Sequence, residues 1–278
     1  MIAWKKRVLA ASIAALTIGL VGCNGSDSSD DSFILQLLHV ADIDGTTDAL
    51  DNVENFSANL AALQSKYPNR TLFLSSGDLY IPGPRYTAAS DESLNELLGE
   101  AGNGRGDIAM LNAMGLQASA VGNHDLDGGT SEFASIIAPS EAGYAGANFP
   151  YLSSNLNFTT DENLVDLVAE DGLDVTEVAG KLVSSTVITV KGEKIGIVGA
   201  STPSLSTITS TGGITVLPED STDTEELANV IQAKVDELIS DEIDKVILLA
   251  HMQRISVEKE LATLLRGVDI IVAGGSNT

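Results

Sequence analysis

The sequence has little cysteine and few basic residues, and each shortage excludes a class of protein. Cys23 is the one cysteine among 278 residues, which excludes an internal disulfide framework and a zinc centre built on cysteines. Lysine and arginine total 15 against 39 acidic residues, a formal net charge of −24. No basic cluster follows the first ten residues, so we expect no binding to a nucleic acid polymer, whose phosphates this acidic field would repel.

Aromatic residues are also scarce, at 4% of the chain. The hydrophobic fraction is nevertheless 44%, and glycine occurs 26 times. This mixture is typical of α/β proteins rather than of disordered acidic chains, and the length suits one large domain or two small ones. We therefore expect a folded chain with a substantial core.

The N-terminus has the pattern of a targeting segment. Lys5, Lys6 and Arg7 precede a mostly apolar stretch over residues 8–21, which is too short to cross a bilayer comfortably but suits a signal peptide. The following Leu-Val-Gly-Cys23 resembles the lipobox of bacterial lipoproteins, which implies lipidation of Cys23 and a lipid-anchored place in the bacterial envelope, periplasmic or at the cell surface. The alternative is an ordinary secretory peptide with an incidental cysteine.

The expected domain organisation follows from this pattern. Residues 1–22 are predicted to be a lipoprotein signal peptide. Residues 23–32 are rich in Ser and Asp, cannot bury apolar surface, and are predicted to be a solvated tether. Residues 33–278 are predicted to form one domain. We expect the protein to contact the membrane through the lipid on Cys23 alone.

Short apolar runs bounded by Gly, Asp, Asn or Ser predict buried strands. They lie at residues 33–40, 71–75, 118–121, 151–154, 182–190, 194–200, 245–250 and 269–273. Helical spacing of apolar residues predicts a helix over 227–239 with Thr224 as a candidate N-cap, and weaker patterns predict helices at 52–66, 92–98, 108–114 and 257–265. A hairpin is expected to turn at 191–193. Strands alternating with helices predict an α/β fold with ligands beyond the strand ends.

Metal-type ligands follow four of these predicted strands. Asp42 and Asp44 follow the first, Asp78 follows the second, Asn123 lies in the motif Gly-Asn-His-Asp-Leu-Asp after the third, and His251 follows a later one. Oxygen and imidazole groups that converge from several strand ends suit a pair of divalent cations, which a carboxylate can bridge. The sequence therefore favours a two-metal site.

Each of these residues also has a structural explanation. Asp-Gly and Gly-Asp pairs are common in turns, and a single histidine at a strand end is more often hydrogen-bonded than a ligand. His39, within the first strand, is expected to be a satisfied core histidine. The tetrapeptide Gly-Asn-His-Asp is rarer than chance placement accounts for. It therefore carries most of the functional argument.

Several blocks of the sequence resemble the calcineurin-like metallophosphoesterases, and within them the secreted 5′-nucleotidase and 2′,3′-cyclic phosphodiesterase group. The blocks are LLHVADIDG, LFLSSGDLYIPGP, LNAMGLQASAVGNHDLDGG, ANFPYLSSNL, EKIGIVGASTPS, VILLAHMQ and GVDIIVAGG, in the family's order. The resemblance implies a four-layer α/β/β/α sandwich with two mixed sheets. It also implies a centre of two divalent metal ions.

The resemblance assigns a role to individual residues. Asp42 would bind one metal, Asp78 would bridge both, and Asn123 and His251 would bind the other. His124 would be the catalytic histidine, oriented by Asp127.

Two motifs depart from the family pattern. Its opening Asp-x-His motif ends here in Asp44, and the histidines that normally follow Gly-Gly are replaced by Ser276 and Asn277. Asp44 can still bind a cation, and Asn277 could supply a neutral oxygen, so Asp44 and Asn277 remain candidate ligands. Oxygen in place of nitrogen disfavours zinc relative to manganese, magnesium or calcium. The metal is therefore Mn, Mg, Ca or Zn, with its identity open.

Nucleotidases of this group continue into a second domain, and this sequence ends at Thr278. The expectation is that the C-terminal nucleotidase domain is absent, through natural truncation, because the chain is a fragment, or because the protein uses one domain alone. Arg85, Arg105 and Arg254 are the nearby candidates for a phosphate contact. None of them matches a family position.

The sequence thus predicts a metal-dependent hydrolase of phosphate esters, of 5′-nucleotidase type. Its expected partner is a small phosphorylated substrate, most naturally a nucleotide. The alternative is a degenerate, non-catalytic surface lipoprotein that binds a cation or a partner. The Gly-Asn-His motif favours the enzyme, and the lost histidines favour the alternative.

Overall fold

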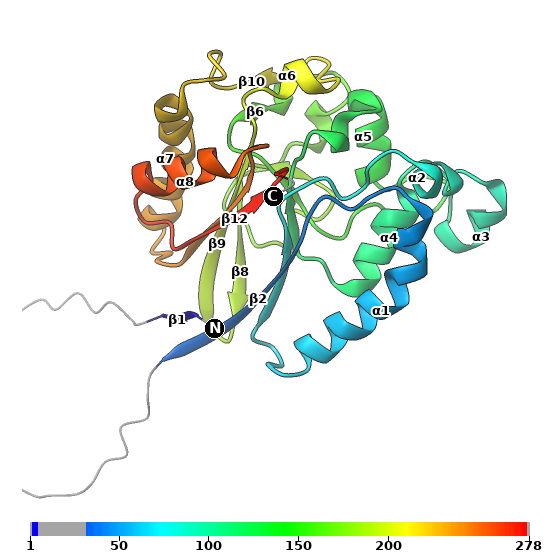
Figure 1. Ribbon diagram of the computed structural model, residues 1–278, viewed down its shortest axis with the longest axis horizontal. Helices are drawn as coiled ribbons and strands as arrows, with labels where there is room; N and C mark the ends of the chain where they lie inside the picture. The colour runs from blue at the N-terminus through cyan, green and yellow to red at the C-terminus, as the bar shows by residue number, and fades with distance from the viewer. Residues whose placement is uncertain (1, 5–31, 277–278) are drawn as a thin grey trace, which may run out of the picture.

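The computed structural model describes residues 2–4 and 32–276 of the chain. Strands occupy the middle of the molecule and helices lie on either side of them (Figure 1). The strands are β1 (Ile2–Trp4), β2 (Phe33–Val40), β3 (Thr71–Ser75), β4 (Ala118–Ala120), β5 (Tyr151–Leu152), β6 (Leu156–Asn157), β7 (Leu182–Val183), β8 (Ser185–Val190), β9 (Glu193–Ser201), β10 (Thr215–Val216), β11 (Val246–His251) and β12 (Ile270–Gly274).

The α-helices of the described residues flank these strands. They are α1 (Thr47–Gln64), α2 (Pro84–Ala88), α3 (Asn95–Leu98), α4 (Arg105–Met114), α5 (Gly129–Ile137), α6 (Leu205–Ile208), α7 (Thr224–Ser240) and α8 (Ile255–Leu264). A short 3-10 helix, η2 (His124–Leu126), follows β4 and contains the histidine of the Gly-Asn-His-Asp motif.

Two larger sheets organise the chain. One has the order β1-β2-β3-β4-β5-β7, in which β1 pairs antiparallel with β2 and the other neighbours are parallel. The other has the order β12-β11-β9-β8, with β8 and β9 antiparallel and the rest parallel. Strands β6 and β10 form a small antiparallel pair. Both larger sheets are therefore mixed.

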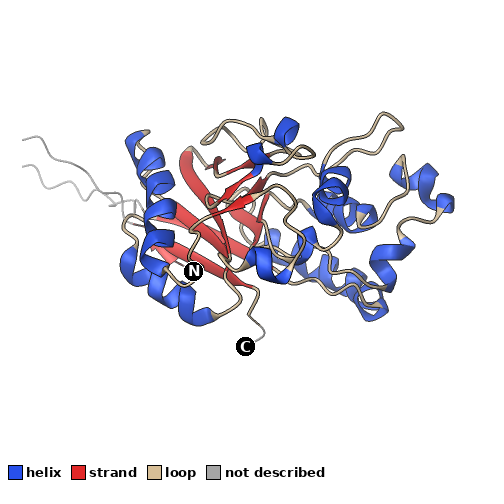
Figure 2. Cartoon of the chain, turned by 90° about the horizontal axis from the view of Figure 1, so that it is seen from above, coloured by secondary structure: helices blue, strands red, loops and turns tan. Residues whose placement is uncertain are grey.

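Three apolar clusters define four layers. Side chains such as Leu74 and Ile197 join the facing surfaces of the two sheets. Ile108 and Phe133 pack helices α4 and α5 against the outer face of the six-stranded sheet, and Ile231 packs α7 on the outer face of the other. Figure 2 shows the strands between the two groups of helices. The α/β/β/α sandwich implied by the resemblance is confirmed.

Most predicted elements are confirmed, with ends that shift by a few residues. The prediction of one strand over 182–190 is wrong, because the chain leaves the six-stranded sheet after β7 and enters the four-stranded sheet with β8. The predicted helix over 92–98 divides into a 3-10 turn and α3. Lys191 and Gly192 both have positive φ, as the predicted hairpin turn requires.

Two local predictions are corrected. The N-cap of α7 is Asp223, whose carboxylate accepts a hydrogen bond from the Glu226 amide, and Thr224 is the first helical residue. An Asp caps better here because its oxygen reaches the N3 amide while its charge meets the positive helix end. His39 is exposed rather than in the core, although its Nε2 has a partner in Ser76 Oγ at 2.8 Å.

Among the helices that the structure describes, none is long and apolar enough to cross a bilayer. Cys23, the signal peptide beyond residue 4 and almost all of the tether lie outside the described residues. Asn277 also lies outside them.

Candidate metal centre

The carboxyl ends of β2, β3, β4 and β11 meet at one edge of the sandwich and bring together residues far apart in sequence. Ligand atoms of Asp42, Asp78 and His251 all lie within 4.8 Å of one another. Asn123 joins them, because its Oδ1 is 3.1 Å from His251 Nε2. The structure thus gathers four of the six predicted metal ligands.

The two aspartates sit on backbone that few residues adopt. Asp42 has φ 54° and Asp78 has φ 55°, in the left-handed region, which Asp tolerates better than bulkier residues. The amide of Asp42 donates to Gly77 O, and that of Ile43 donates to Asp78 O, so the two loops hold each other. Backbone strain of this kind is found where a site needs a side chain in a fixed place.

His251 is oriented by its own hydrogen bonds. Its Nδ1 lies 2.8 Å from the carbonyl oxygen of Ser76, which directs Nε2 toward Asp78 Oδ2 at 3.1 Å. A backbone carbonyl on one ring nitrogen is the usual way to present the other to a metal. Burial lowers the pKa of His251, but the hydrogen bond and charge of Asp78 raise it to about 9. A bound cation would therefore have to displace a proton from this pair.

Asp125 holds the backbone around the ligands in place, and it was not predicted as a site residue from the sequence. Its carboxylate accepts hydrogen bonds from the amides of Asp78, Leu79 and Gly122, at 3.2, 3.4 and 2.7 Å. Burial, with the charge of Asp78, raises the pKa of Asp125 to about 7. The sequence signal was its place within Gly-Asn-His-Asp.

His124 and Asp127 form the predicted pair beside the ligands. Nδ1 of His124 is 2.6 Å from Oδ2 of Asp127, and the His124 amide donates to Asp78 Oδ1 at 2.7 Å. Burial lowers the pKa of His124, but Asp127 and the charges of Asp78 and Asp125 raise it above its usual value. Thr209, which was not predicted from the sequence, donates to the other Asp127 oxygen at 3.0 Å.

Gly122 has a steric role in the same motif. A Cβ at this position would lie 2.1 Å from Asp78 Oδ1 and 2.6 Å from the Asp78 amide nitrogen. No side chain fits there, which explains why glycine begins the motif.

The remaining predicted ligand within the described residues lies apart from this cluster. Asp44 is exposed, and it does not belong to the group of residues whose ligand atoms lie within 4.8 Å. Gly275, near the other end of the domain, donates its amide to Asp42 Oδ2 at 3.1 Å. The last described residues therefore reach the first aspartate of the site.

The donor set fits a divalent cation. Asp42 and Asp78 bring two carboxylates, Asn123 an amide oxygen and His251 an imidazole nitrogen, and these are the ligand types of Mn, Mg, Ca and Zn sites. Asp78 and His251 are almost fully buried. Two carboxylates held so close would repel each other in the absence of positive charge, which favours a cation between them.

The three candidate arginines differ in availability. Arg85 is buried in an ion pair with Asp107 at 2.6 Å, and Arg105 pairs with Glu100 at 2.6 Å and stacks over Tyr144. Both are therefore engaged in the fold. Arg254 is exposed at the start of α8, where it lines a polar cavity of about 310 Å³ between the N-terminal ends of α7 and α8.

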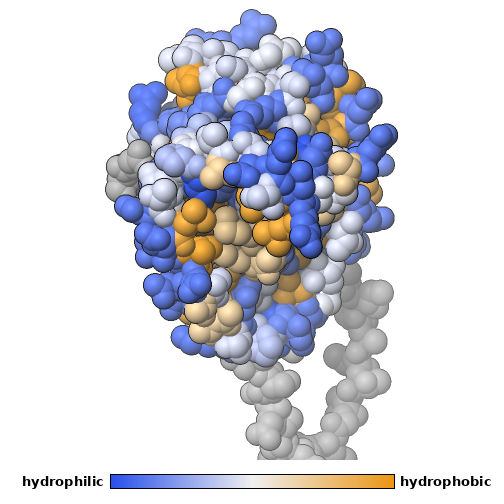
Figure 3. All heavy atoms as spheres, turned by 90° about the vertical axis from the view of Figure 1, so that its right-hand side faces the viewer, coloured by the Kyte–Doolittle hydropathy of each residue, from blue (hydrophilic) through white to orange (hydrophobic). Residues whose placement is uncertain are grey.

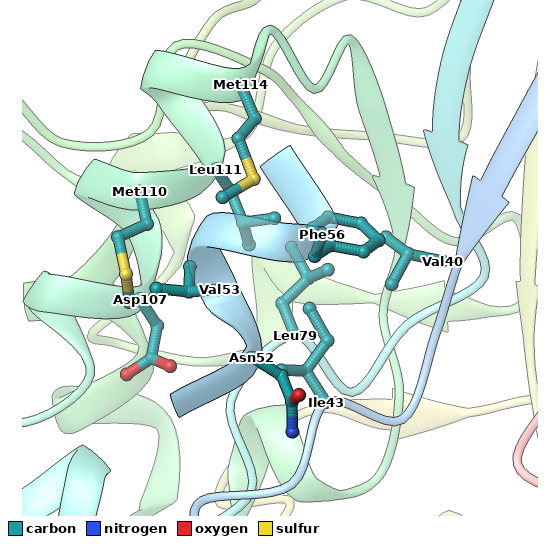
Figure 4. Close-up of a pocket in the computed structure, with 10 residues that line it drawn as sticks. All are labelled: Val40, Ile43, Asn52, Val53, Phe56, Leu79, Asp107, Met110, Leu111 and Met114. Atoms are coloured by element: carbon teal, nitrogen blue, oxygen red, sulfur yellow. The ribbon is translucent and has the colours of Figure 1, made fainter. Parts of the chain in front are cut away.

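An apolar cavity of about 210 Å³ lies behind the site, between α1 and α4. Figure 4 shows Ile43 and Leu79 at its wall, together with Phe56 and Met114. Ile43 follows Asp42 and Leu79 follows Asp78 in sequence. The residues that follow the two aspartates in sequence therefore line this cavity.

A second apolar hollow, of about 550 Å³, lies between α2, α3 and α4. It includes Leu97, whose residue surface is 80% exposed. Figure 3 faces this side of the molecule and shows apolar residues gathered around a depression. The hollow and the metal ligands share no residue.

The two-sheet sandwich with carboxylate, amide and imidazole groups at one edge defines the class of the protein, a metallophosphoesterase-type domain. Similarity in sequence identifies the family within this class. Residues 35–276 match the model for calcineurin-like phosphoesterases, and the chain belongs to this family.

Named relatives agree with this membership. The chain is 33% identical over 168 residues to a 5′-nucleotidase of Diplobatis ommata, covering 60% of this chain and 25% of that protein. It is 25% identical over 268 residues to the trifunctional nucleotide phosphoesterase protein YfkN of Bacillus subtilis strain 168, covering 92% of this chain and 16% of that protein. The chain therefore spans a quarter or less of the length of these two relatives.

The fold also matches solved structures. A 5′-nucleotidase precursor from Thermus thermophilus superposes with a TM-score of 0.63 over 87% of this chain and 41% of that chain, at 23% identity. The YfkN phosphoesterase from Bacillus subtilis gives 0.57 over 87% of this chain and 71% of that chain, at 20% identity. At these identities the likeness supports the fold alone.

Proposed function

We propose that the chain is a metal-dependent hydrolase of phosphate esters with a nucleotide as its substrate. The observation that carries the proposal is the convergence of Asp42, Asp78 and His251 within 4.8 Å at the sheet edge. Family membership supports the reaction class. The nucleotide substrate is supported by the names of the 5′-nucleotidase and YfkN relatives.

The residues gathered at the sheet edge supply the ligands for divalent cations. Asp42, Asp78, Asn123 and His251 would hold the cations, with Asp44 and Asn277 as further ligands to test. Bound divalent ions stabilise the charge that develops on the phosphoryl oxygens and supply a nucleophile from water at neutral pH. They also offset the chain's own negative field, which would otherwise repel a phosphate.

His124 is placed to move a proton. Its Nδ1 is engaged by Asp127, so Nε2 is the ring atom left to act on a leaving oxygen. Although burial lowers the pKa of His124, Asp127 and the neighbouring carboxylates raise it above its usual value, which favours the protonated form that a general acid requires. Asp127, itself held by Thr209, fixes the ring orientation.

Arg254 is the arginine that we assign to substrate phosphate. Arg85 and Arg105 are paired within the fold, whereas the Arg254 side chain is exposed in a polar cavity close to the end of β11. A single exposed arginine contributes modest binding, so we expect weak affinity and broad substrate specificity.

The non-catalytic alternative has one structural observation in its favour, the separation of Asp44 from the other ligands. The test is hydrolysis of a chromogenic phosphomonoester, a diester, a nucleoside monophosphate and a 2′,3′-cyclic nucleotide by the purified protein, with Mn²⁺, Mg²⁺, Ca²⁺ or Zn²⁺ added in turn. Turnover that requires an ion and is lost in His124→Ala supports the enzyme. Ion binding without turnover of any substrate supports the alternative.

Location is proposed on the sequence motif alone. The Leu-Val-Gly-Cys23 box supports a lipid-anchored protein of the bacterial envelope, facing the periplasm or the cell surface. Such a place suits a hydrolase that acts on external or periplasmic nucleotides.

A further inference from the structure

Gln253 places its side-chain amide among the ligand atoms of His251 and Asn123. Its Nε2 lies 3.0 Å from His251 Nε2 and donates a hydrogen bond to Asn123 Oδ1. The same His251 nitrogen lies 3.1 Å from Asn123 Oδ1 and 3.1 Å from Asp78 Oδ2. The amide therefore stands against the atoms that the family resemblance assigns to the second cation.

The backbone at this position shows that the placement is specific. Gln253 has φ 64°, in the left-handed region that glycine enters without penalty and a residue with a Cβ enters at a cost. Gly275 leaves room for the amide, because a Cβ there would lie 2.8 Å from Gln253 Nε2 and 2.7 Å from His251 Nε2. Gln253 thus has a strained backbone conformation, and its side chain occupies the space left by Gly275.

A carboxamide nitrogen resembles a cation in one respect, because it donates and does not accept hydrogen bonds. One amide hydrogen meets Asn123 Oδ1. The same amide nitrogen lies 3.0 Å from His251 Nε2, within the space that an ion bound to this ring atom would need. The Asn123 oxygen that would bind an ion is then satisfied by the chain itself.

We propose that Gln253 is a built-in occupant of the second cation position, so that the chain binds one divalent ion tightly and a second only after this amide withdraws. The inference deepens the proposed function and depends on the metal centre assigned there. Asp42 and Asp78 would hold the first ion, and the described hydrogen bonds of the Gln253 side chain go to Asn123 and His251 instead. The second ion must compete with the amide for Asn123 and His251.

The test is calorimetric titration of the purified full chain with Mn²⁺ in the absence of substrate. Wild type is compared with Gln253→Ala and Gln253→Gly, and Gln64→Ala, at the end of α1, is the matched control. We expect wild type to show one tight and one weak site. Because the amide and its hydrogen bond to Asn123 no longer oppose the ion, both Gln253 variants should bind the second ion about tenfold or more tightly, with the first site unchanged.

Thermal unfolding gives a second readout that does not depend on turnover. In EDTA, Gln253→Ala should unfold at a lower temperature than wild type, because it loses the amide contacts and retains a Cβ on strained backbone. Gln253→Gly should recover part of that loss, since glycine relieves the strain. With saturating Mn²⁺ both variants should gain more in unfolding temperature than wild type gains.

Three results would overturn the proposal. Weaker binding of the second ion in the variants would make Gln253 a ligand through its oxygen. Two equal, tight sites in wild type would show that the amide is no obstacle, and one site in every variant would show that no second position was opened. Failure of the proposed function is a different result, since it appears as absent hydrolysis whatever the ion binding.

Discussion

Nδ1 of His124 lies 2.6 Å from Oδ2 of Asp127, and the histidine follows the proposed ligand Asn123 while standing outside the cluster of Asp42, Asp78 and His251. This separation allows catalysis and metal binding to be tested independently. His124→Ala should retain its metal content and lose turnover by roughly a hundred to ten thousand-fold, the usual contribution of a positioned acid. Metal analysis and kcat on the same preparations would check this, and loss of metal in His124→Ala would contradict the role.

Asp127→Asn gives the corresponding pH prediction. Asp127 raises the pKa of His124 through its hydrogen bond and its charge, so its removal should lower that pKa. A general acid with a lower pKa loses its proton at lower pH, and the alkaline limb of the pH–rate profile should move to lower pH. NMR titration of the imidazole would measure the shift directly. An unmoved alkaline limb would assign it to another group.

Thr209 is a positioning residue whose effect should be smaller. Its hydroxyl donates to Asp127 Oδ1 at 3.0 Å, on the side away from His124. Loss of one such hydrogen bond corresponds to about 1 kcal/mol, so Thr209→Val should lower kcat by about two- to tenfold with KM little changed. Thr209→Ser keeps the hydroxyl and should restore the rate. A change in KM alone would instead place Thr209 on the substrate.

The aspartates should differ in their effect on metal binding. Asp78 faces both Asp42 and His251, so Asp78→Ala should abolish binding of both ions, whereas exposed Asp44→Ala should weaken one. Asp44→His should move the preference toward zinc, because imidazole is a softer ligand than carboxylate. Metal content by elemental analysis would decide. An unchanged metal content in all three variants would show that Asp44 and Asp78 are not metal ligands.

The layers of the fold could be predicted from the sequence because buried strands and amphipathic helices leave clear patterns. The division of residues 182–190 between two sheets could not be predicted, since both parts have the pattern of a buried strand. The break at Ser184 depends on which strands each part pairs with in the folded chain. Asp42, Asp78, Asn123 and His251 were predicted because each ends a strand. Their mutual distances come from tertiary structure.

Other features of the site left little trace in the sequence. Gln253 has no special character as a residue type, and its importance comes from a left-handed backbone and a space opposite Gly275. Thr209 is distant in sequence from Asp127. His39 was wrongly assigned to the core because an apolar strand suggests burial on both faces, whereas β2 is exposed at this position.

Cys23 provides a test of location. If the motif directs lipidation, wild-type protein expressed in a bacterium should be found in the membrane fraction, and Cys23→Ala should move to the soluble fraction. Each buried methylene contributes about 0.8 kcal/mol, and stable anchoring needs more than one acyl chain. Mass spectrometry of the N-terminal peptide would identify the lipid. Soluble, unlipidated wild-type protein would leave the ordinary secretory peptide as the better interpretation.

Asp107 should make stability depend on pH. Burial raises its pKa to about 6 although Arg85 lies 2.6 Å away and opposes the shift. A carboxyl group whose pKa is higher in the folded state favours the fold while it is protonated, and this contribution is lost as the pH rises from the unfolded pKa, 3.8, through about 6.

The variant Asp107→Asn isolates this contribution, because it cannot titrate and the charge of Arg85 stays constant over the range. One pKa unit corresponds to about 1.4 kcal/mol, so the stability of wild type relative to Asp107→Asn should fall by on the order of 3 kcal/mol between pH 3.5 and pH 7. Urea unfolding of both proteins across this range would measure the difference. A difference that stays constant with pH would mean that Arg85 compensates the burial of the carboxylate completely, and that the pair is ionised throughout.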